Sequence, residues 1–202
     1  MSKDGINPVP ADEEIVKQYW KWLCSLPRPT NPAIDNDGDR DEKANNPNNE
    51  YVFLSFVLGG GSRRICAIPY GKKVVIPSLS CICSEAERPG SNDDDLRRFA
   101  DVDHDNIEYR RIEIDGKPLV GDLDKRFRIR TKPFDVEYPQ KAIFNVRPGR
   151  SRAVADGVYV VWAPPKGEHI IHFEGKIDIP EEEESLENRD YVEDVTYTLK
   201  VN

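Results

Sequence analysis

Two apolar runs on either side of a short, proline-containing connection constrain the fold of this chain most strongly. Val158–Trp162 and His169–Phe173 each have the length and composition of a buried strand. The connection between them, Ala163–Glu168, contains two adjacent prolines, which remove backbone N–H donors and interrupt helices and central strands alike. Gly167 permits the positive φ that a chain reversal often needs. This pattern predicts a β-hairpin at the centre of an antiparallel sheet.

Turn signals elsewhere in the chain predict two further hairpins. Arg64–Pro69 and Lys72–Pro77 flank the turn signal Tyr70-Gly71. Asp115-Gly116, a strong two-residue turn signal, follows the strand pattern at Ile107–Ile114. Other short strands are predicted at residues 51–58, 118–120, 126–130, 134–138, 142–146 and 195–201. Many short strands with closely spaced turns are typical of a β-sandwich or a jelly roll.

One amphipathic helix is predicted near the N-terminus, over residues 12–26. Ile15, Tyr19 and Trp22 recur at helical spacing, and acidic residues at the start of the helix suit the positive end of its dipole. A second, shorter helix is predicted at residues 93–100. We therefore expect a mainly β protein, an antiparallel, jelly-roll-like β-sandwich with one N-terminal α-helix packed on it. The predicted organisation is a flexible arm at residues 1–11, a single domain at 12–202, and long polar loops at 27–50, 84–105 and 176–192.

The charge balance and the lack of a long apolar segment narrow the classes of function. The net charge of −8 disfavours sequence-independent binding to nucleic acid or to an anionic membrane surface. No apolar run is as long as the roughly 20 residues that a membrane-spanning helix needs. The N-terminal segment lacks the apolar core of a signal peptide, which predicts a cytoplasmic location.

Eight short motifs follow one another in a recognisable order. They are Tyr19-Trp20-Lys21-Trp22, Asn31-Pro32, Gly59–Gly61, Arg64–Lys72 (R-x-C-x-I-P-x-G-K), Cys83-Ser84, Asp156–Tyr159, Lys166–Gly175 (x-G-x-H-x-I-x-F-x-G) and Val195-Thr196-Tyr197. This order resembles a family of functionally uncharacterised archaeal and bacterial proteins, many of them exported. The resemblance implies a β-sandwich fold and brings no activity with it. Members often have a further cysteine in the loop before the first strand, where this chain has acidic and amide residues instead.

An acidic loop between the predicted helix and the first strand is a candidate calcium site. Asp35, Asp37, Asp39 and Asp41 alternate with other residues there, and Ca²⁺ is bound by several carboxylate and carbonyl oxygens of a flexible loop. The spacing is not that of an EF-hand, because Arg40 stands where the glycine is needed. The alternative interpretation is a solvated turn without an ion.

Three cysteines form a second candidate site. Cys81 and Cys83 are two residues apart, so in an extended segment both thiols point to one face, as chelation of a soft metal requires. A disulfide between the two would be strained, whereas Cys66 could join either of them as a third ligand or as a disulfide partner. The alternative is a set of small apolar side chains without further chemistry.

The histidines are weaker candidates. His169 and His172 are three residues apart on a predicted strand, so their rings are expected to project to opposite faces and to share no metal. His104 lies between Asp103 and Asp105, which would raise its pKa if their carboxylates are close.

Basic residues alternate along one predicted strand. Arg126, Arg128 and Arg130 are expected to share a face. Their expected partners are carboxylates of neighbouring strands: Glu108, Glu113 or Glu137. An anion-binding patch is the alternative interpretation.

No nucleophile elbow, phosphate-binding loop, dinucleotide fingerprint or H-E-x-x-H helix is present. The sequence therefore favours a non-catalytic module that binds a partner protein, a glycan-like ligand or a second copy of itself as a homo-oligomer. One alternative is a metal protein, with calcium at Asp35–Asp41 or a thiophilic metal at Cys66, Cys81 and Cys83. Another is an enzyme that uses His104 or Cys83.

Overall fold

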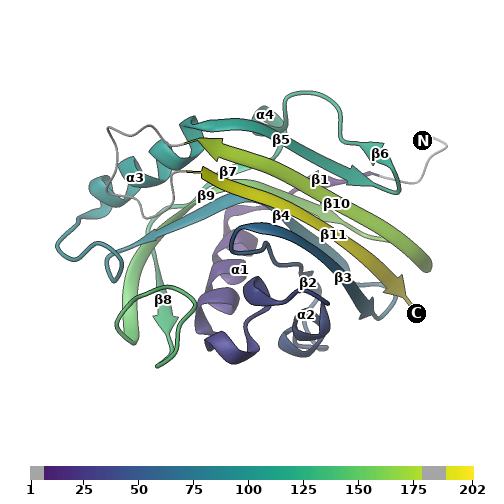
Figure 1. Cartoon of the computed structure of the whole chain (residues 1–202), viewed down its shortest axis with the longest axis horizontal. Helices are drawn as coiled ribbons and strands as arrows, with labels where there is room; N and C mark the ends of the chain where they lie inside the picture. Colours follow the sequence, from purple (N-terminus) through teal and green to yellow (C-terminus); the bar gives the residue numbers. More distant parts are fainter. Residues whose placement is uncertain (1–6, 179–189) are drawn as a thin grey trace.

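The computed structural model describes residues 7–178 and 190–202, except for the side chains of Asp39 and Asp190. Two β-sheets pack face to face, and a single N-terminal helix covers the outside of one of them (Figure 1), which confirms the mainly β, sandwich-like prediction. The helices are α1 (Glu13–Ser25), α2 (Asp39–Ala44), α3 (Asp93–Asp105) and α4 (Leu123–Phe127), with 3₁₀ turns η1 (Arg28–Thr30) and η2 (Pro32–Ile34). The strands are β1 (Val9–Pro10), β2 (Tyr51–Phe53), β3 (Gly60–Ile68), β4 (Lys73–Ser84), β5 (Ile107–Ile114), β6 (Lys117–Pro118), β7 (Arg128–Arg130), β8 (Phe134–Tyr138), β9 (Gly149–Trp162), β10 (Gly167–Asp178) and β11 (Asp190–Val201).

The two sheets are mixed rather than purely antiparallel. Sheet A has the order β1-β9-β4-β2, with β7 and β8 also paired to β9, and sheet B has the order β3-β11-β10-β5-β6. Most neighbours are antiparallel, as predicted. The pairs β2–β4 and β3–β11, however, are parallel. Neither parallel pair joins two consecutive strands, and the local pattern of residues does not indicate such pairings.

Two of the three predicted hairpins are wrong, and for the same reason. β9 and β10 do not pair with each other, because β9 lies in sheet A and β10 lies in sheet B. The proline-containing connection carries the chain from one sheet to the other. The connection at Tyr70-Gly71 does the same, since it leads from β3 in sheet B to β4 in sheet A. An apolar run indicates that a strand is buried but does not identify its neighbour.

The third hairpin is confirmed. β5 and β6 pair in antiparallel fashion around Asp115-Gly116. Asp115 has φ of 51° and Gly116 has φ of 69°, as a two-residue turn of this type requires.

Other boundaries also differ from the predictions. The predicted strand at 126–130 begins as helix α4 and is extended only in β7, and the predicted strand at 51–58 is shortened to β2. No strand forms at 142–146, and the helix predicted at 93–100 continues to Asp105. Within the expected N-terminal arm, Val9–Pro10 pairs with β9. The described ends of the expected loop at 176–192 belong to β10 and β11, while residues 1–6 and 179–189 lie outside the described part of the chain.

The predicted N-terminal helix is confirmed as α1, which covers the outer side of sheet A. The Asp12 carboxylate accepts a hydrogen bond from the Ile15 backbone N–H at 2.8 Å and caps the helix. Tyr19 and Trp20 are buried against the sheet, where the Trp20 indole donates to the Tyr159 hydroxyl at 2.6 Å. None of the helices in residues 7–178 and 190–202 is long and apolar enough to cross a bilayer.

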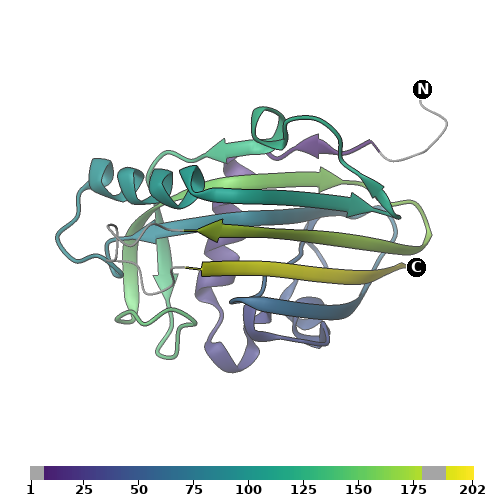
Figure 2. The same cartoon turned by 45° about the horizontal axis from the view of Figure 1, so that its top comes forward.

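The inner side of sheet A, which faces sheet B, has two covers along its length. Over most of that length sheet B packs on it, and residues such as Val158, Trp162 and Phe173 form the core. β4 and β9 extend beyond the end of sheet B, and there helix α3 packs on them through Leu96 and Ala100 (Figure 2). The helix leads directly into β5, so it continues the second layer of the sandwich.

Candidate functional site

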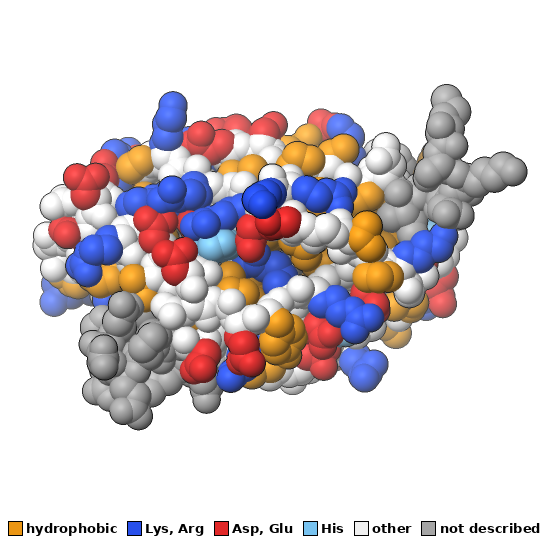
Figure 3. All heavy atoms as spheres, turned by 90° about the horizontal axis from the view of Figure 1, so that it is seen from above, with side chains coloured by type: hydrophobic (Ala, Val, Ile, Leu, Met, Phe, Trp, Pro, Cys, Tyr) orange, Lys and Arg blue, Asp and Glu red, His pale blue; other side chains and the backbone are white. Residues whose placement is uncertain are grey.

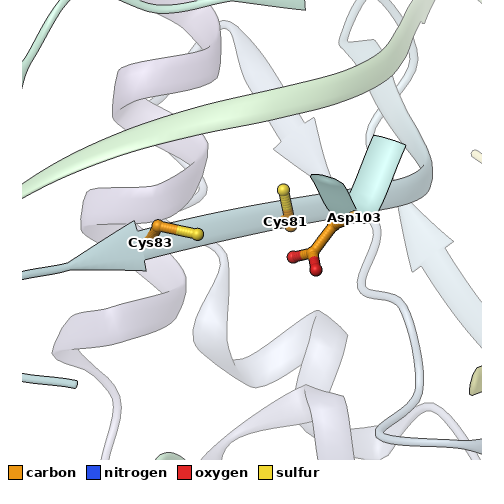
Figure 4. A group of neighbouring side chains, drawn as sticks. All are labelled: Cys81, Cys83 and Asp103. Carbon is orange, nitrogen blue, oxygen red and sulfur yellow. The ribbon is translucent and has the colours of Figure 1, made fainter. Parts of the chain in front are cut away.

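Helix α3 and strand β4 together hold a group of two thiols and one carboxylate. Cys81 and Cys83 project from β4 on the same face, as predicted, and Asp103 approaches them from α3 (Figure 4). The ligand atoms of the three side chains all lie within 4.8 Å of one another. Cys83 is buried, whereas Cys81 and Asp103 are partly accessible. We call these three residues the thiol–carboxylate site.

A β-bulge in β4 places the thiols on the inner side of the sheet. Ser78 pairs with Val158, and the next pair joins Cys81 to Asp156, so β4 contains one residue more than β9 between them. Without the extra residue, the period of two would turn Cys81 and Cys83 to the outer side. The bulge has a strained residue, Leu79, with φ of 40°.

The bulge also requires a glycine on the opposite strand. Gly157 of β9 has φ of 147°, and a Cβ atom built on it would lie 2.6 Å from the Cα of Ser80. Any other residue would therefore collide with the bulge. Gly157 is thus needed to keep the two thiols on the inner side of the sheet.

The carboxylate reaches the thiols because of the helical period of α3. The Asn92 side chain accepts hydrogen bonds from two backbone N–H groups of the first turn and, with Asp95, forms a capping box that fixes the start of the helix. Leu96, Ala100 and Asp103 then follow at spacings of four and three on one face. The first two pack beside Cys83 and Val154, and the third meets the thiols.

The environment of Cys81 suppresses the ionisation of its thiol. A hydrogen bond with Cys83, burial and the nearby Asp103 carboxylate raise the pKa of Cys81 well above its usual value. Protonated thiols are poor nucleophiles at neutral pH. A bound metal ion, by contrast, deprotonates the thiols that coordinate it. The chemistry that fits this site is coordination rather than nucleophilic attack.

Cys66 is not part of this group. Cys66 lies on β3 in the core between the two sheets, where burial raises its pKa to about 12. The structure therefore does not bring Cys66 to Cys81 and Cys83 as a third ligand. All four cysteines are free thiols, so the alternative of a disulfide is not realised.

The acidic loop is used to anchor the fold. Asp41 is fully buried and lies 3.5 Å from the Arg64 guanidinium, and it accepts a hydrogen bond from the Tyr197 hydroxyl at 2.9 Å. Arg64 also donates to the Tyr197 hydroxyl at 2.6 Å. This buried ion pair holds α2 against sheet B.

The described carboxylates of that loop do not converge on one point. Asp35 accepts a hydrogen bond from the backbone N–H of Arg40 at 2.7 Å, whereas Asp41 points into the core and Asp37 is exposed. The side chain of Asp39 lies outside the described part of the structure. Among the described residues, the thiol–carboxylate site is the group of three potential metal ligands that the fold assembles. The geometry gives the calcium hypothesis no support.

A buried polar network lies where the last turn of α3 meets the end of sheet B. His104 Nε2 is 3.2 Å from Asp124, and Nδ1 is 3.9 Å from the fully buried Asp156. Arg128 holds Asp156 with two hydrogen bonds of 2.9 and 2.8 Å. We call His104, Asp124, Asp156, Arg110 and Glu193 the seam network. Figure 3 shows the face above it, where basic and acidic side chains gather around a histidine.

The pKa of His104 is lowered rather than raised. Burial, together with Arg128 and Arg110, lowers the pKa of the imidazole although Asp156 and Asp124 oppose this effect. His104 forms its ion pairs with Asp124 and Asp156, which come from other elements, because a helix directs adjacent side chains about 100° apart.

The seam network also secures the bulge. The backbone N–H of Leu79 donates to Glu193 at 3.0 Å, and the backbone carbonyl of Leu79 accepts from Arg110 at 3.1 Å. Arg110 also pairs with Asp124. Burial raises the pKa of Glu193 to about 7. One buried carboxyl and one buried guanidinium thus hold the strained residue from opposite sides.

The remaining candidates have structural partners. His169 faces inward and lies 2.9 Å from Asp115, while His172 faces outward and lies 3.0 Å from Asp194, which confirms that the two rings occupy opposite faces. Arg128 and Arg130 do have acidic partners, but these are Asp156 and Asp101 rather than the predicted glutamates.

Sequence reasoning did not identify Asp103 as a partner of the thiols. The only signal was its spacing from Leu96 and Ala100 on the apolar side of a helix. Comparisons with protein-family models, with curated proteins and with solved structures give no significant match. The family resemblance therefore stays a prediction, and the site must be interpreted from its own chemistry.

Proposed function

We propose that this protein is a non-catalytic binding protein whose ligand is a thiophilic divalent metal ion of the Zn²⁺ class. The ion would be held by Cys81, Cys83 and Asp103. The observation that carries the proposal is the convergence of two thiols and one carboxylate from two separate elements within 4.8 Å. This combination of ligand types, sulfur together with carboxylate oxygen, is one that zinc accepts.

The spacing of the ligand atoms is compatible with one ion. Zinc lies about 2.3 Å from a thiolate sulfur and about 2.0–2.2 Å from a carboxylate oxygen, so tetrahedral ligands are about 3.5–4 Å apart. Ligand atoms that lie within 4.8 Å of one another need to approach by only about 1 Å to reach that separation. Three protein ligands leave a fourth position for water or another donor, and the Ala100 carbonyl lies 3.8 Å from the Cys81 sulfur.

The alternatives fit the same residues less well. A disulfide between Cys81 and Cys83 would distort a regular strand, because side chains two residues apart on a strand project in parallel. A nucleophilic role requires a lowered thiol pKa, whereas the pKa of Cys81 is raised. A binding partner beyond the metal, whether protein, glycan-like ligand or second copy, stays a prediction.

Metal analysis tests the proposal directly. Protein purified without chelators is dialysed against Zn²⁺ and then buffer, and bound zinc is measured by mass spectrometry. We expect about one equivalent per chain, because structural zinc binds tightly at neutral pH. Cd²⁺ should produce a thiolate charge-transfer absorption band. Cys81→Ala should lose both signals.

The matched control is Cys66→Ala, which removes a buried thiol remote from the site. Zinc binding should be unchanged in this variant. Retention of zinc by Cys81→Ala and Asp103→Asn at the wild-type level would refute the proposal.

A further inference from the structure

The two long helices of this protein are attached to sheet A with very different amounts of apolar contact. Both α1 and α3 have 13 residues. Helix α1 buries six of its side chains, five of them apolar or aromatic besides Cys24. Helix α3 buries only Leu96, Ala100 and His104. Because apolar burial is the main source of docking energy, α3 is held more weakly than α1.

Helix α3 nevertheless supplies side chains that organise a charged face of the protein. Arg97 donates to the Thr131 carbonyl at 2.5 Å, Asp101 accepts from Arg130 at 2.6 and 2.8 Å, and His104 lies 3.2 Å from Asp124. These contacts connect α3 to β7 and α4 on the face seen in Figure 3. The arrangement of this face therefore depends on where α3 lies.

The thiol–carboxylate site bridges the weakly attached helix and the sheet. Cys81 and Cys83 belong to β4, and Asp103 belongs to the last turn of α3. We propose that a metal ion at this site latches α3 onto β4 and thereby keeps the charged face over β7 and α4 assembled. This inference rests on the proposed function and adds a conformational role for the ion.

The ion can hold α3 against β4 because its ligands come from both of these elements. An ion that is coordinated by all three residues binds only the docked arrangement of α3 with full affinity. An ion that contacts β4 alone loses the carboxylate. The difference between these affinities shifts the population toward the docked helix. Without the ion, the short apolar contact of Leu96 and Ala100 with Cys83 and Val154 must hold the helix together with the ion pairs.

Hydrogen exchange of the full-length protein, with and without Zn²⁺, tests the latch. If release of the ion and opening of α3 are coupled, amide exchange in Leu96–Asp105 should slow by about 100-fold at a free zinc concentration of about 100 times Kd. The amides of β7 should slow in the same direction. Amides of α1 that exchange by local opening, without global unfolding, should show no change.

Two variants of α3 separate the latch from general electrostatic effects. Asp103→Asn should remove the slowing of α3 exchange by zinc. Asp101→Asn removes a carboxylate of the same helix that pairs with Arg130 rather than with the thiols. This control should keep the zinc-dependent slowing of exchange in α3, even if its exchange without zinc is faster than in the wild type.

The outcomes distinguish the two proposals. If one equivalent of zinc binds and exchange of α3 is unchanged, the latch is overturned while the proposed function stands. If Asp103→Asn still shows the full zinc-dependent slowing, the latch is also overturned. If zinc does not bind to the wild-type protein, the proposed function fails and the latch fails with it.

Discussion

The inner side of strands β4 and β9 is covered by sheet B along one part and by helix α3 along another. The first part provides the apolar core, and the second holds the polar and thiol side chains. Beneath sheet B, the inward side chains are apolar and large, such as Ile76, Val160 and Trp162. Beneath α3, the same side carries Cys81, Cys83 and Asp156. A sheet packed on a sheet excludes water along whole strands, so polar side chains are costly there. A single polar helix leaves room for thiols, charges and exchange with solvent.

The largest expected effect is on the core beneath sheet B. Phe173→Ala should lower the free energy of unfolding by about 3–5 kcal/mol, because it removes a fully buried ring and leaves a cavity. Leu96→Ala is the matched change beneath α3, and its main effect should be faster amide exchange in α3. Urea denaturation and hydrogen exchange measure the two effects. Equal loss of global stability in both variants would show that the two regions unfold as one unit.

The next effect concerns the buried carboxyl of the seam network. Burial raises the folded-state pKa of Glu193 to about 7, above the usual glutamate value of 4.5, so between these pH values the folded protein binds a proton that the unfolded chain releases. The contribution of Glu193 to stability is therefore greatest below about pH 4.5 and falls as the pH rises to about 7, by up to about 3 kcal/mol. Glu193→Gln should flatten this decline and be more stable than the wild type at pH 8.

Urea denaturation at several pH values measures the slope. Asp41, whose pKa burial also raises to about 7, contributes a slope of the same sign, so part of the decline should persist in Glu193→Gln. The exposed Glu108→Gln is the control and should leave the slope unchanged. An unaltered slope in Glu193→Gln would contradict the ionisation assigned to the seam network.

A somewhat smaller effect is expected from zinc. At a free concentration of about 100 times Kd, Zn²⁺ should raise the free energy of unfolding by about 2.7 kcal/mol, because it binds the folded state. Asp103→Asn should lose most of this gain. Thermal denaturation with a zinc titration measures the difference, and identical shifts in both proteins would exclude Asp103 as a ligand.

The smallest effect is expected at the partly exposed rim of the charged face. Asp101→Asn should change the free energy of unfolding by about 1 kcal/mol or less, because its pairs with Arg128 and Arg130 are partly solvated. The change should become smaller at high salt, since mobile ions screen exposed charges. A loss of unfolding free energy as large as that of Phe173→Ala would show that the charged face contributes as much to stability as the apolar core.

The patterns that predicted correctly are those in which neighbouring residues determine the outcome. Helix α1 follows from its apolar stripe and its Asp12 cap, and the β5–β6 turn follows from Asp115-Gly116. The common face of Cys81 and Cys83 follows from the two-residue period of a strand. The exclusion of Cys66 and the recruitment of Asp103 do not follow from local pattern, because both depend on which strand and helix pack together.

The amino-acid sequence by itself determined that this chain forms a mainly β sandwich with an N-terminal helix, because periodicity, capping and turn chemistry act over a few residues. The tertiary structure alone decided which strands are neighbours, since burial is equally satisfied by a partner in either sheet. It also decided the site. The bulge at Leu79 and the packing of α3 bring Cys81, Cys83 and Asp103 together from segments that share no local interaction.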